Sequence, residues 1–302
     1  MSSSAPSLKT ALFPIAGLGS RLMPLTKGVN KALLPVYDRC LLQAVLDEAV
    51  SVGVERFIFI VTKGDRSIAD YLRPHKALDA FVAKKKAQGH KEGETIGAFL
   101  DRLSFISKGS IIVEQDSPRG LGDAIFCAAS HVADDDYYAV LLADDFIDTE
   151  GKTCLQQMCD GWHRRGQQGA WVALEQVAYE DVSRYGVIRP VCGEVDMMDG
   201  VTSGIEASEI VEKPMREHAP SNWAVVGRYI LPRDVMERLA HIDVGAGGEH
   251  QLTDGLAAYM ASRGALYGMP FQGWRFDCGS KDGLLAAACH RQKHIGCGQH
   301  KT

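Results

Sequence analysis

The sequence predicts an α/β protein, in which helices cover both faces of a β-sheet. Short runs rich in β-branched and aromatic residues alternate along the chain with longer segments whose apolar residues recur at helical spacing. A helical segment separates the first two of these runs, which makes a βαβ unit. Because the 302 residues are 46% hydrophobic, the chain can also bury a large core around such a sheet.

Seven segments carry the strand signal. We expect strands at Thr10–Ala16, Arg56–Thr62, Ser110–Glu114, Tyr137–Ala143, Ala170–Val177, Ala224–Ile230 and Ala265–Phe271. The helix of the βαβ unit is predicted over "CLLQAVLDEAVSVGV", where Gly53 ends the helical spacing. In parallel α/β sheets, ligands bind at the carboxyl ends of the strands, so we expect a functional site at that edge.

Charge and apolar runs limit the partners and the location of the protein. The formal net charge is −5, which argues against binding of a nucleic-acid polymer or an anionic membrane, so any cationic site must be local. The longest apolar runs, "RFIFIVT" and "YYAVLLA", are too short to span a bilayer, and the N-terminus lacks the apolar stretch of a signal peptide. We therefore expect a cytoplasmic protein. The eight cysteines contain no CxxC pair and are interpreted as reduced thiols, without zinc or disulfides.

The chain shows no internal repeat and no proline- and serine-rich linker that would divide it. We expect an N-terminal arm over residues 1–9, one main domain over residues 10–279, and a helical C-terminal segment with a tail over residues 280–302. The charged stretch "ALDAFVAKKKAQGHKEGETIGAFLDRL" is predicted to be helical, and its lysine run is interpreted as a solvated face because acidic residues follow closely.

The stretch "GLGSRLMPLTKGVNK" follows the first predicted strand and has the composition of a phosphate-binding loop. It lacks the third glycine of a dinucleotide fingerprint and the Gly-Lys-Ser/Thr of a Walker A loop. However, Gly17 and Gly19 allow backbone amides to approach a ligand, while Arg21, Lys27 and Lys31 supply positive charge. This grouping suits a triphosphate better than a nicotinamide cofactor; the alternative is a turn that carries solvated basic residues.

Two further segments place polar side chains where strands end. Asp144 and Asp145 follow the apolar run "YYAVLLA", so a strand would deliver a carboxylate to the expected crevice, where Mg²⁺ could bind together with phosphate oxygens. Gln115 precedes the "GLG" of Gly120 to Gly122, and its amide can both donate to and accept from the edge of a pyrimidine. The alternative for Gln115 is a surface glutamine before a turn at the start of a helix.

The arrangement of "GLGSRLMPLTK" and "KALLPV" resembles the start of the sugar-1-phosphate nucleotidylyltransferases. Further segments match that family in order and spacing over about Thr10 to Ala288, and several are especially similar to its bacterial UTP:glucose-1-phosphate uridylyltransferases. These segments are "EQDSPRGLGDAI", "LLADD", "SRYGVI", "EIVEKP", "APSNWAVVGRYIL", "EHQLTDGLAAYM" and "FDCGSKDG". The resemblance implies the nucleotidyltransferase (Rossmann-like) fold, with a twisted mixed β-sheet. It also implies Mg²⁺-dependent uridylyl transfer from UTP to glucose 1-phosphate.

The resemblance also implies roles for individual residues, in four groups. The implied catalytic residues are Arg21, Lys31 and Lys213. The implied nucleotide-binding residues are Gly17, Leu18, Gly19, Ser20, Lys27, Gln115 and Gly120. The implied sugar-phosphate-binding residues are Gly186, Glu212 and Lys213. The implied Mg²⁺ ligands are Asp144 and, as a possible second carboxylate, Asp277.

Some neighbouring polar residues are interpreted as structural. Asp145 and Asp148 are expected to be solvated in a loop or to cap a helix. Asn222 and Arg228 fall in a matching segment, and Arg228 is expected either to contribute to the site or to hold a neighbouring carboxylate. Because nucleotidyl transfer needs no covalent protein nucleophile, positioning and charge neutralisation are expected to supply most of the catalysis.

The sequence departs from the family pattern at several points. "KALLP" is more similar to the glucose-1-phosphate thymidylyltransferases, Asp123 stands where a histidine is usual, and Ala143 stands where a proline is usual. Thymidylyl transfer therefore stays an alternative, as does a weakly catalytic regulatory homologue that binds nucleotide sugars. The resemblance and the helical C-terminal segment also suggest a homodimer or homotetramer.

Overall fold

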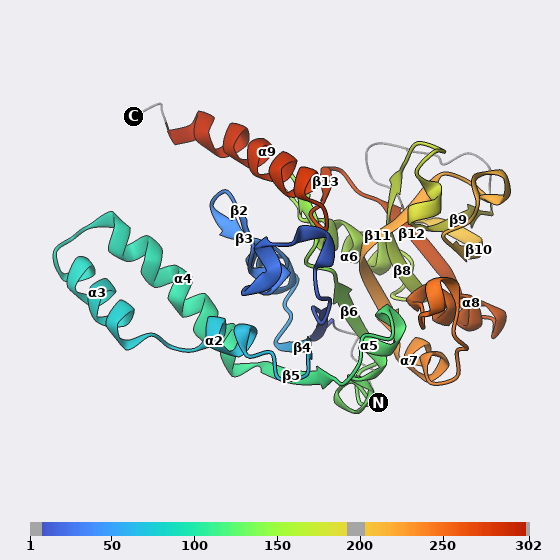
Figure 1. The fold of residues 1–302 in the computed structure, drawn as a ribbon, viewed down its shortest axis with the longest axis horizontal. Helices are drawn as coiled ribbons and strands as arrows, with labels where there is room; N and C mark the ends of the chain where they lie inside the picture. Colours follow the sequence, from blue (N-terminus) through green and yellow to red (C-terminus); the bar gives the residue numbers. More distant parts are fainter. Residues whose placement is uncertain (1–7, 192–202, 300–302) are drawn as a thin grey trace.

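The computed structural model describes the backbone of residues 8–191 and 203–299 and the side chains of residues 8–191 and 203–294. Residues 1–7 of the expected N-terminal arm, Cys192, the side chain of Cys297 and residues 300–302 of the expected tail lie outside these described parts. Within them, one mixed sheet has the strand order β5-β4-β1-β6-β11-β8-β12-β10-β9 (Figure 1). The predicted α/β fold with a mixed sheet is confirmed.

All seven predicted strands are present, with ends that differ from the expected ones by up to two residues. They are β1 (Thr10–Pro14), β4 (Arg56–Thr62), β5 (Ser110–Gln115), β6 (Tyr137–Leu141), β8 (Ala170–Gln176), β11 (Trp223–Pro232) and β12 (Leu266–Pro270). The structure adds further strands that were not predicted: β9 (Gly186–Pro190), β10 (Ile205–Glu212) and the two small antiparallel pairs β2 (Pro35–Val36) with β3 (Arg39–Cys40) and β7 (Asp145–Asp148) with β13 (Trp274–Asp277).

The strand directions create the edge at which the site lies. β5, β4, β1 and β6 are parallel neighbours, so their carboxyl ends meet at one edge of the sheet. β11 runs antiparallel to β6 and to β8, which brings the start of β11 toward that edge. As a result, the loop after β1, the end of β5 and the Asp144 region after β6 share one side of the molecule.

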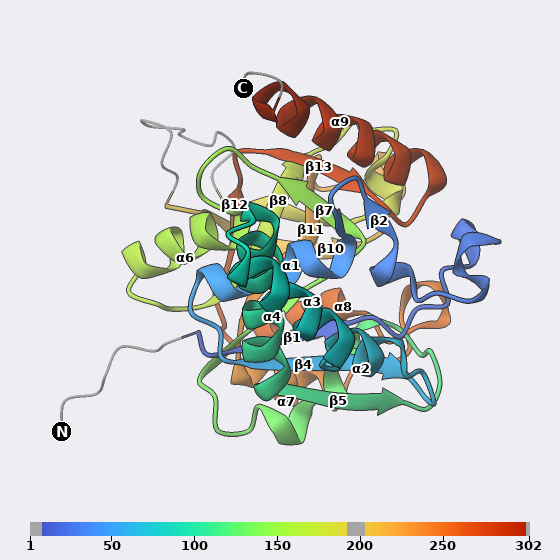
Figure 2. The same cartoon turned by 90° about the vertical axis from the view of Figure 1, so that its left-hand side faces the viewer.

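Alternate side chains of the central strands enter two separate cores, one on each face of the sheet. On β4, Phe57, Phe59 and Val61 belong to one core, whereas Ile58 and Ile60 belong to the other. The first core is completed by helices α1 (Leu41–Ser51) and α6 (Cys154–Arg164), and the second by α5 (Leu121–Phe126), α7 (Arg233–Leu239) and α8 (Leu252–Ala261) (Figures 1 and 2). The sheet is therefore covered on both faces, as predicted.

The remaining helices lie at the periphery. The charged stretch predicted to be helical forms two antiparallel helices, α3 (Lys76–Ala87) and α4 (Lys91–Lys108), because Gly89 adopts a φ of 71° that ends the first one; α2 (Ser67–Leu72) precedes them. The long helix α9 (Lys281–Gln299) follows β13 and crosses the top of the view in Figure 1. No helix in the described ranges is long and apolar enough to cross a membrane.

Candidate active site

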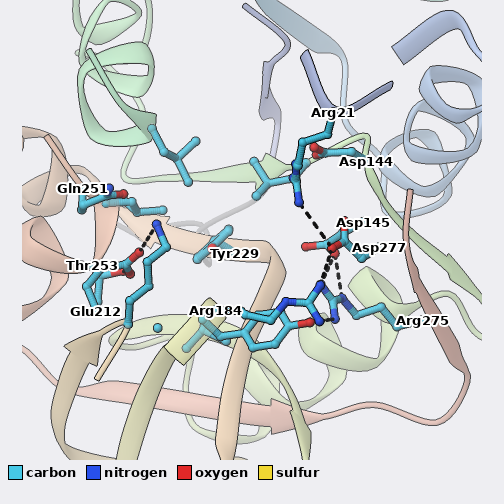
Figure 3. Close-up of a pocket in the computed structure, with 17 residues that line it drawn as sticks. Arg21, Asp144, Asp145, Arg184, Glu212, Tyr229, Gln251, Thr253, Arg275 and Asp277 are labelled. Atoms are coloured by element: carbon cyan, nitrogen blue, oxygen red, sulfur yellow. Dashed lines mark hydrogen bonds and ion pairs between the residues drawn. The ribbon is translucent and has the colours of Figure 1, made fainter. Parts of the chain in front are cut away.

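A cavity of about 500 Å³ opens at the carboxyl edge of the sheet, between the ends of β6 and β13 and the segments around β9, β10 and α8 (Figure 3). Most of its polar lining comes from charged side chains. The lining residues are Arg21, Leu121, Leu142, Asp144, Asp145, Arg184, Tyr185, Gly186, Glu212, Lys213, Val225, Tyr229, Gln251, Leu252, Thr253, Arg275 and Asp277. Six of the predicted site residues thus line one cavity: Arg21, Asp144, Gly186, Glu212, Lys213 and Asp277.

The glycine-rich loop folds back on itself through short 3₁₀ turns. Gly19 has a φ of 63°, a left-handed conformation that glycine adopts without strain, and its carbonyl accepts a hydrogen bond from the Thr26 hydroxyl at 2.9 Å. Leu22 is fully buried and anchors the loop, and the Asn30 amide donates to the carbonyl of Ile15 at 3.2 Å. These contacts place Lys31 directly beside the first strand end.

Lys31 and Asp144 form an ion pair at the edge of the cavity, with 2.6 Å between Nζ and Oδ2. Burial alone raises the pKa of the Asp144 carboxyl, but the charge of Lys31 and its hydrogen bond outweigh burial and lower that pKa below its ordinary value. Asp144 therefore remains a carboxylate, an oxygen ligand or partner for a cation, over the whole physiological pH range.

Asp277 is the second carboxylate at this end of the cavity. It ends β13, where it pairs in register with Asp145 of β7, and the amide of Cys278 donates to the carbonyl of Asp144 at 2.8 Å. Two arginines from other segments reach Asp277 Oδ2, namely Arg184 at 3.1 Å and Arg21 at 4.0 Å. Arg21, whose side chain is 66% exposed, therefore turns toward the cavity rather than away from it.

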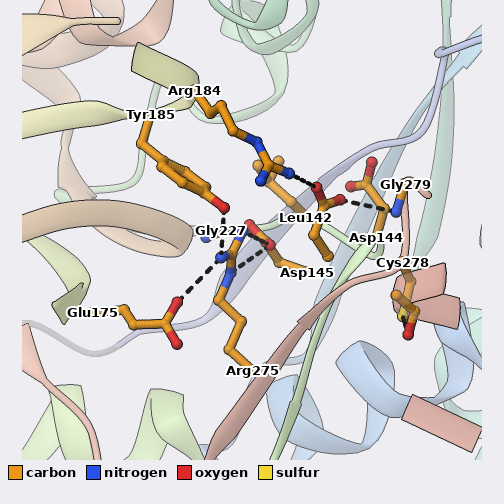
Figure 4. Close-up of polar contacts among 12 residues, drawn as sticks. Leu142, Asp144, Asp145, Glu175, Arg184, Tyr185, Gly227, Arg275, Cys278 and Gly279 are labelled. Carbon is orange, nitrogen blue, oxygen red and sulfur yellow. Dashed lines mark hydrogen bonds and ion pairs between the residues drawn. The ribbon is translucent and has the colours of Figure 1, made fainter. Parts of the chain in front are cut away.

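The interpretation of Asp145 as a solvated or capping residue is wrong. Its Oδ2 accepts from the amide of Gly227 at 2.8 Å, and its Oδ1 forms an ion pair with Arg275 at 2.5 Å (Figure 4). Arg275 is 7% exposed and also contacts the carboxylate of Glu175 and the hydroxyl of Tyr185. Burial raises the pKa of Asp145. Asp145 therefore holds β7 and β13 to Arg275 and Gly227 in the wall of the cavity, which is a structural contact.

The same interpretation of Asp148 is also wrong. Its carboxylate pairs with Arg291 of α9 at 2.7 Å and with His290 at 3.2 Å. Arg291 in turn pairs with Asp38, in the turn between β2 and β3, at 2.9 Å. Asp148 therefore links α9 to the strand pair β7–β13. This pair begins next to Asp144 and ends at Asp277.

The expected sugar-phosphate residues lie together on the opposite side of the cavity from Arg21 and Asp144 (Figure 3). Lys213 Nζ lies 3.1 Å from Glu212 Oε1, and the Thr253 hydroxyl donates to Glu212 Oε2 at 2.6 Å. Gly186 packs so closely on this group that a Cβ there would lie 3.1 Å from the Thr253 hydroxyl oxygen. The backbone of Gly186 is therefore accessible to a ligand only because it has no side chain.

None of the seven expected nucleotide-binding residues, Gly19 included, lines this cavity. Leu18, Ser20 and Lys27 are exposed on the glycine-rich loop, and Gly17 lies beside Lys31. Gln115 lies at the end of β5 and Gly120 precedes α5. These residues lie at the adjoining part of the carboxyl edge. There, Thr62 of β4 pairs in register with Gln115, and the Thr62 hydroxyl donates a hydrogen bond to the carbonyl of Ala16.

Arg228 and Asn222 have structural contacts. Arg228 is 1% exposed and its Nε donates to Glu48 of α1 at 2.8 Å, while Nη1 donates to the carbonyls of Leu142 and Asp145. The Asn222 amide donates to the carbonyl of Val177 at 3.0 Å. Of the two options for Arg228, the structure thus supports the one in which it holds a carboxylate.

Sequence reasoning missed the lining residues Arg184, Tyr229, Gln251, Thr253 and Arg275. Four of them fall in segments that matched the family, namely "SRYGVI", "APSNWAVVGRYIL" and "EHQLTDGLAAYM", but these segments gave no sign of which side chain faces the cavity. Arg275 stands two residues before Asp277, so strand alternation could have indicated that both side chains lie on one side of the pair β7–β13.

The donor set at the strand ends fits Mg²⁺. Within the described residues, no group of three or more His, Cys, Asp or Glu side chains could hold a metal. Asp144 and Asp277 instead offer two carboxylates next to a cavity large enough for phosphates. Mg²⁺ commonly takes one or two carboxylates and completes its octahedron with water and phosphate oxygens, so this pair suits a cation that binds together with its substrate.

Comparison with known proteins agrees with this geometry over nearly the whole chain. A family model described as nucleotidyl transferase matches residues 15–294. The UTP–glucose-1-phosphate uridylyltransferase of Komagataeibacter xylinus is 36% identical over 275 residues, which cover 91% of this chain and 90% of that protein. The protein of the same name from Pseudomonas aeruginosa is 34% identical and covers 93% and 94%.

Solved structures give the same result. A UDP-glucose pyrophosphorylase in complex with UDP-glucose matches with a TM-score of 0.78 and 34% identity, covering 95% of this chain and 99% of that one. A UTP-bound enzyme of this kind from Acinetobacter baumannii matches with a TM-score of 0.76 and 32% identity, covering 94% and 93%. The chain therefore belongs to the nucleotidyl transferase family, as a relative of the bacterial UTP–glucose-1-phosphate uridylyltransferases.

Proposed function

We propose that the protein transfers UMP from UTP to glucose 1-phosphate, which gives UDP-glucose and pyrophosphate. One observation carries the proposal: a single cavity is lined by Arg21, Asp144 and Asp277 on one side and by the Glu212–Lys213 pair on the other, while Lys31 reaches Asp144 from outside the lining. Two substrates that both carry phosphates need two sets of charged side chains, one on each side of the cavity. The names of the relatives, UTP–glucose-1-phosphate uridylyltransferases, support UTP as the nucleotide and glucose 1-phosphate as the sugar phosphate.

In the proposed reaction, a phosphate oxygen of glucose 1-phosphate attacks the α-phosphorus of UTP, and the bond to pyrophosphate breaks in line. No covalent bond to the protein forms, so positioning and charge stabilisation are the tasks left to the side chains. The amides of Gly17 to Ser20, together with Arg21 and Lys27, bind the triphosphate. Lys31 offers an ammonium beside Asp144, where negative charge on the phosphates accumulates.

On the other side, Lys213 is the point charge for the phosphate of the sugar. The Glu212 carboxylate accepts hydrogen bonds from sugar hydroxyls. In the structure, this carboxylate accepts from the Thr253 hydroxyl and pairs with Lys213. Gly186 lets the sugar approach the backbone. This division predicts that variants on the two sides of the cavity impair different substrates.

Asp144 and Asp277 are the residues that would hold Mg²⁺. The cation would neutralise phosphate charge and orient the reacting oxygens. The protein itself contributes the depressed pKa of Asp144, which keeps that carboxylate free of a proton for the cation.

The test is a rate comparison in which the purified protein receives glucose 1-phosphate with UTP, dTTP, ATP, CTP or GTP in turn. Pyrophosphate release and mass spectrometry of the nucleotide sugar measure the product. We expect UTP to react fastest. A clear preference for dTTP, which "KALLPV" would suggest, would replace uridylyl by thymidylyl transfer. Nucleotide binding in titration calorimetry without pyrophosphate release from any pair of substrates would instead support a regulatory role.

We also propose that residues 10–279 form the catalytic domain, that residues 280–302 form a C-terminal segment, and that the chain assembles as a homodimer or homotetramer. Sedimentation of the purified protein tests the assembly, and one monomeric species would refute it. The cytoplasmic location stays a prediction.

A further inference from the structure

Gln115 and Asp123 form a buried side-chain pair at the end of β5. Gln115 is 4% exposed and Asp123, in the first turn of α5, is 9% exposed. Gln115 Nε2 donates to Asp123 Oδ2 at 2.6 Å, and the other carboxylate oxygen pairs with Arg119 Nη2 at 2.8 Å. Both oxygens of Asp123 are therefore occupied by donors.

The chemistry of this pair determines which end of the amide faces Asp123. A carboxylate can only accept hydrogen bonds, so the NH₂ group of Gln115 must face it and the amide oxygen must face the opposite way. No hydrogen-bond donor from the described residues reaches Gln115 Oε1. Within the described parts of the chain, Gln115 thus keeps its acceptor oxygen and one of its two N–H groups free, and Asp123 fixes the order in which the amide presents them.

This acceptor lies next to the proposed nucleotide site. The backbone of Gln115 pairs with Thr62, whose hydroxyl holds the carbonyl of Ala16 immediately before the glycine-rich loop. Further along the chain from Gln115, Gly120 and Gly122 pack against the backbone of His250, and Leu121 between them lines the cavity. A nucleotide whose phosphates contact the loop would bring its base to this part of the edge.

We propose that Asp123 is a specificity-determining positioning residue, which holds the Gln115 amide in one orientation, with its acceptor oxygen facing ring position 3 of the base. Uracil and thymine carry an N–H at ring position 3 and can donate to this oxygen. Cytosine carries a lone pair there and is rejected. The inference rests on the proposed function in one respect: Gln115 must contact the base.

The cost of accepting cytosine explains why the pair discriminates. The amide would have to turn over, which breaks the hydrogen bond to Asp123 and brings Gln115 Oε1 against a carboxylate oxygen. A buried polar mismatch of this kind discriminates far more strongly than a difference in shape alone.

Asp123→Asn tests the proposal. The Asn amide can donate as well as accept, so Gln115 can then bind in either orientation. We expect the ratio of kcat/KM for UTP to that for CTP to fall about tenfold, the size of one hydrogen bond to a charged group, mainly because CTP improves. Asp116→Asn is the matched control. That aspartate is 78% exposed, pairs with Lys63 and should leave the ratio unchanged.

Binding provides a readout that does not depend on turnover. Titration calorimetry with UTP and CTP should show the same loss of selectivity in Asp123→Asn, even if the parent proves to release no pyrophosphate. Arg119→Ala, at an exposed position, should shift the ratio in the same direction by a smaller factor and guards against a folding defect in the first variant. An unchanged ratio in both variants, or an equal loss for UTP and CTP, overturns the inference.

Discussion

At the scale of single residues, charge geometry distinguishes the two ends of the cavity. Arg21 presents a planar donor fork near Asp277, whereas Lys213 presents one ammonium beside Glu212. The first group lies with the carboxylates that fit a cation, and the second lies with the segment expected to bind the sugar (Figure 3). The two side chains should therefore affect different kinetic constants.

Arg21→Lys should lower kcat roughly 10²- to 10³-fold, because a lysine cannot reproduce the two-pronged contact to phosphate oxygens as charge shifts onto pyrophosphate. The KM for glucose 1-phosphate should change little. Steady-state rates of pyrophosphate release measure both constants. Arg189→Lys is the control, since Arg189 is an exposed residue paired with Glu209 outside the cavity. Parental activity of Arg21→Lys at limiting UTP would show that the loop is an ordinary turn.

Lys213→Ala should give the reverse pattern. Removal of the ammonium weakens the attraction for the sugar phosphate, so the KM for glucose 1-phosphate should rise at least about tenfold while the KM for UTP stays near the parental value. The exposed Lys63, in an ion pair with Asp116, provides a Lys→Ala control. If the KM for UTP rose instead, the two sides of the cavity would have to be exchanged in the mechanism.

At the scale of elements, α9 is fastened to the strand pair that positions the site. Arg291 of α9 pairs with Asp38 between β2 and β3 and with Asp148 of β7, and β7 pairs with β13 so that Asp145 lies opposite Asp277. The C-terminal helix thus stabilises a pair of strands whose ends form the site, although none of the α9 side chains described, up to residue 294, lines the cavity.

Asp38→Asn should lower the free energy of unfolding by about 1 kcal/mol at neutral pH. Burial raises the pKa of Asp38, but hydrogen bonds and attraction from Arg291 and Arg39 outweigh it and lower that pKa below 3.8. A depressed pKa in the folded state contributes stability that is present above the unfolded pKa and is lost as the pH falls through the folded one. The difference between parent and variant should therefore be constant near neutrality and shrink below pH 3.8.

Urea unfolding at a series of pH values measures this difference. Glu55→Gln is the control because Glu55 forms an exposed pair with Lys9, away from α9. A difference that kept its full size in acid would mean that Asp38 acts through something other than its charge.

At the scale of the whole molecule, the cavity joins segments from both halves of the chain. β1 and β6 support the glycine-rich loop and Asp144, while β9, β10 and α8 contribute Gly186, Glu212 and Thr253. A ligand that contacts both groups should therefore stabilise the fold as a unit.

UTP with Mg²⁺ should raise the melting temperature of the parent, since a ligand at a hundred times its Kd stabilises the native state by about 2.7 kcal/mol. Chelation by EDTA should remove most of that increase. In Asp144→Asn, UTP with Mg²⁺ should raise the melting temperature only by the smaller amount that does not depend on the metal. Thermal unfolding with and without each component measures these shifts. A melting temperature that UTP raises equally with Mg²⁺ and with EDTA would contradict a metal at this carboxylate.

Sequence reasoning was reliable where the signal is local. Short runs of β-branched and aromatic residues, bounded by turn residues, predicted the seven strands, because such side chains pack well on a pleated sheet and the runs are too short for typical helices. It missed β10, where the register shifts between Ala207 and Glu209 and interrupts the alternation, and it missed the very short β7 and β13. It predicted the glycine-rich loop and Asp144 for the same local reason, since both directly follow a strand.

The order of motifs in the sequence by itself determined the fold class, the family and the residues to be tested. Only the tertiary structure decided which of those residues share the cavity and which neighbouring acids are structural. Asp145 meets Arg275 across 130 positions of sequence, and Glu48 meets Arg228 across 180. A carboxylate that follows a strand looks the same in sequence whether it faces a ligand or a buried arginine, because its partner is chosen by the packing of distant elements.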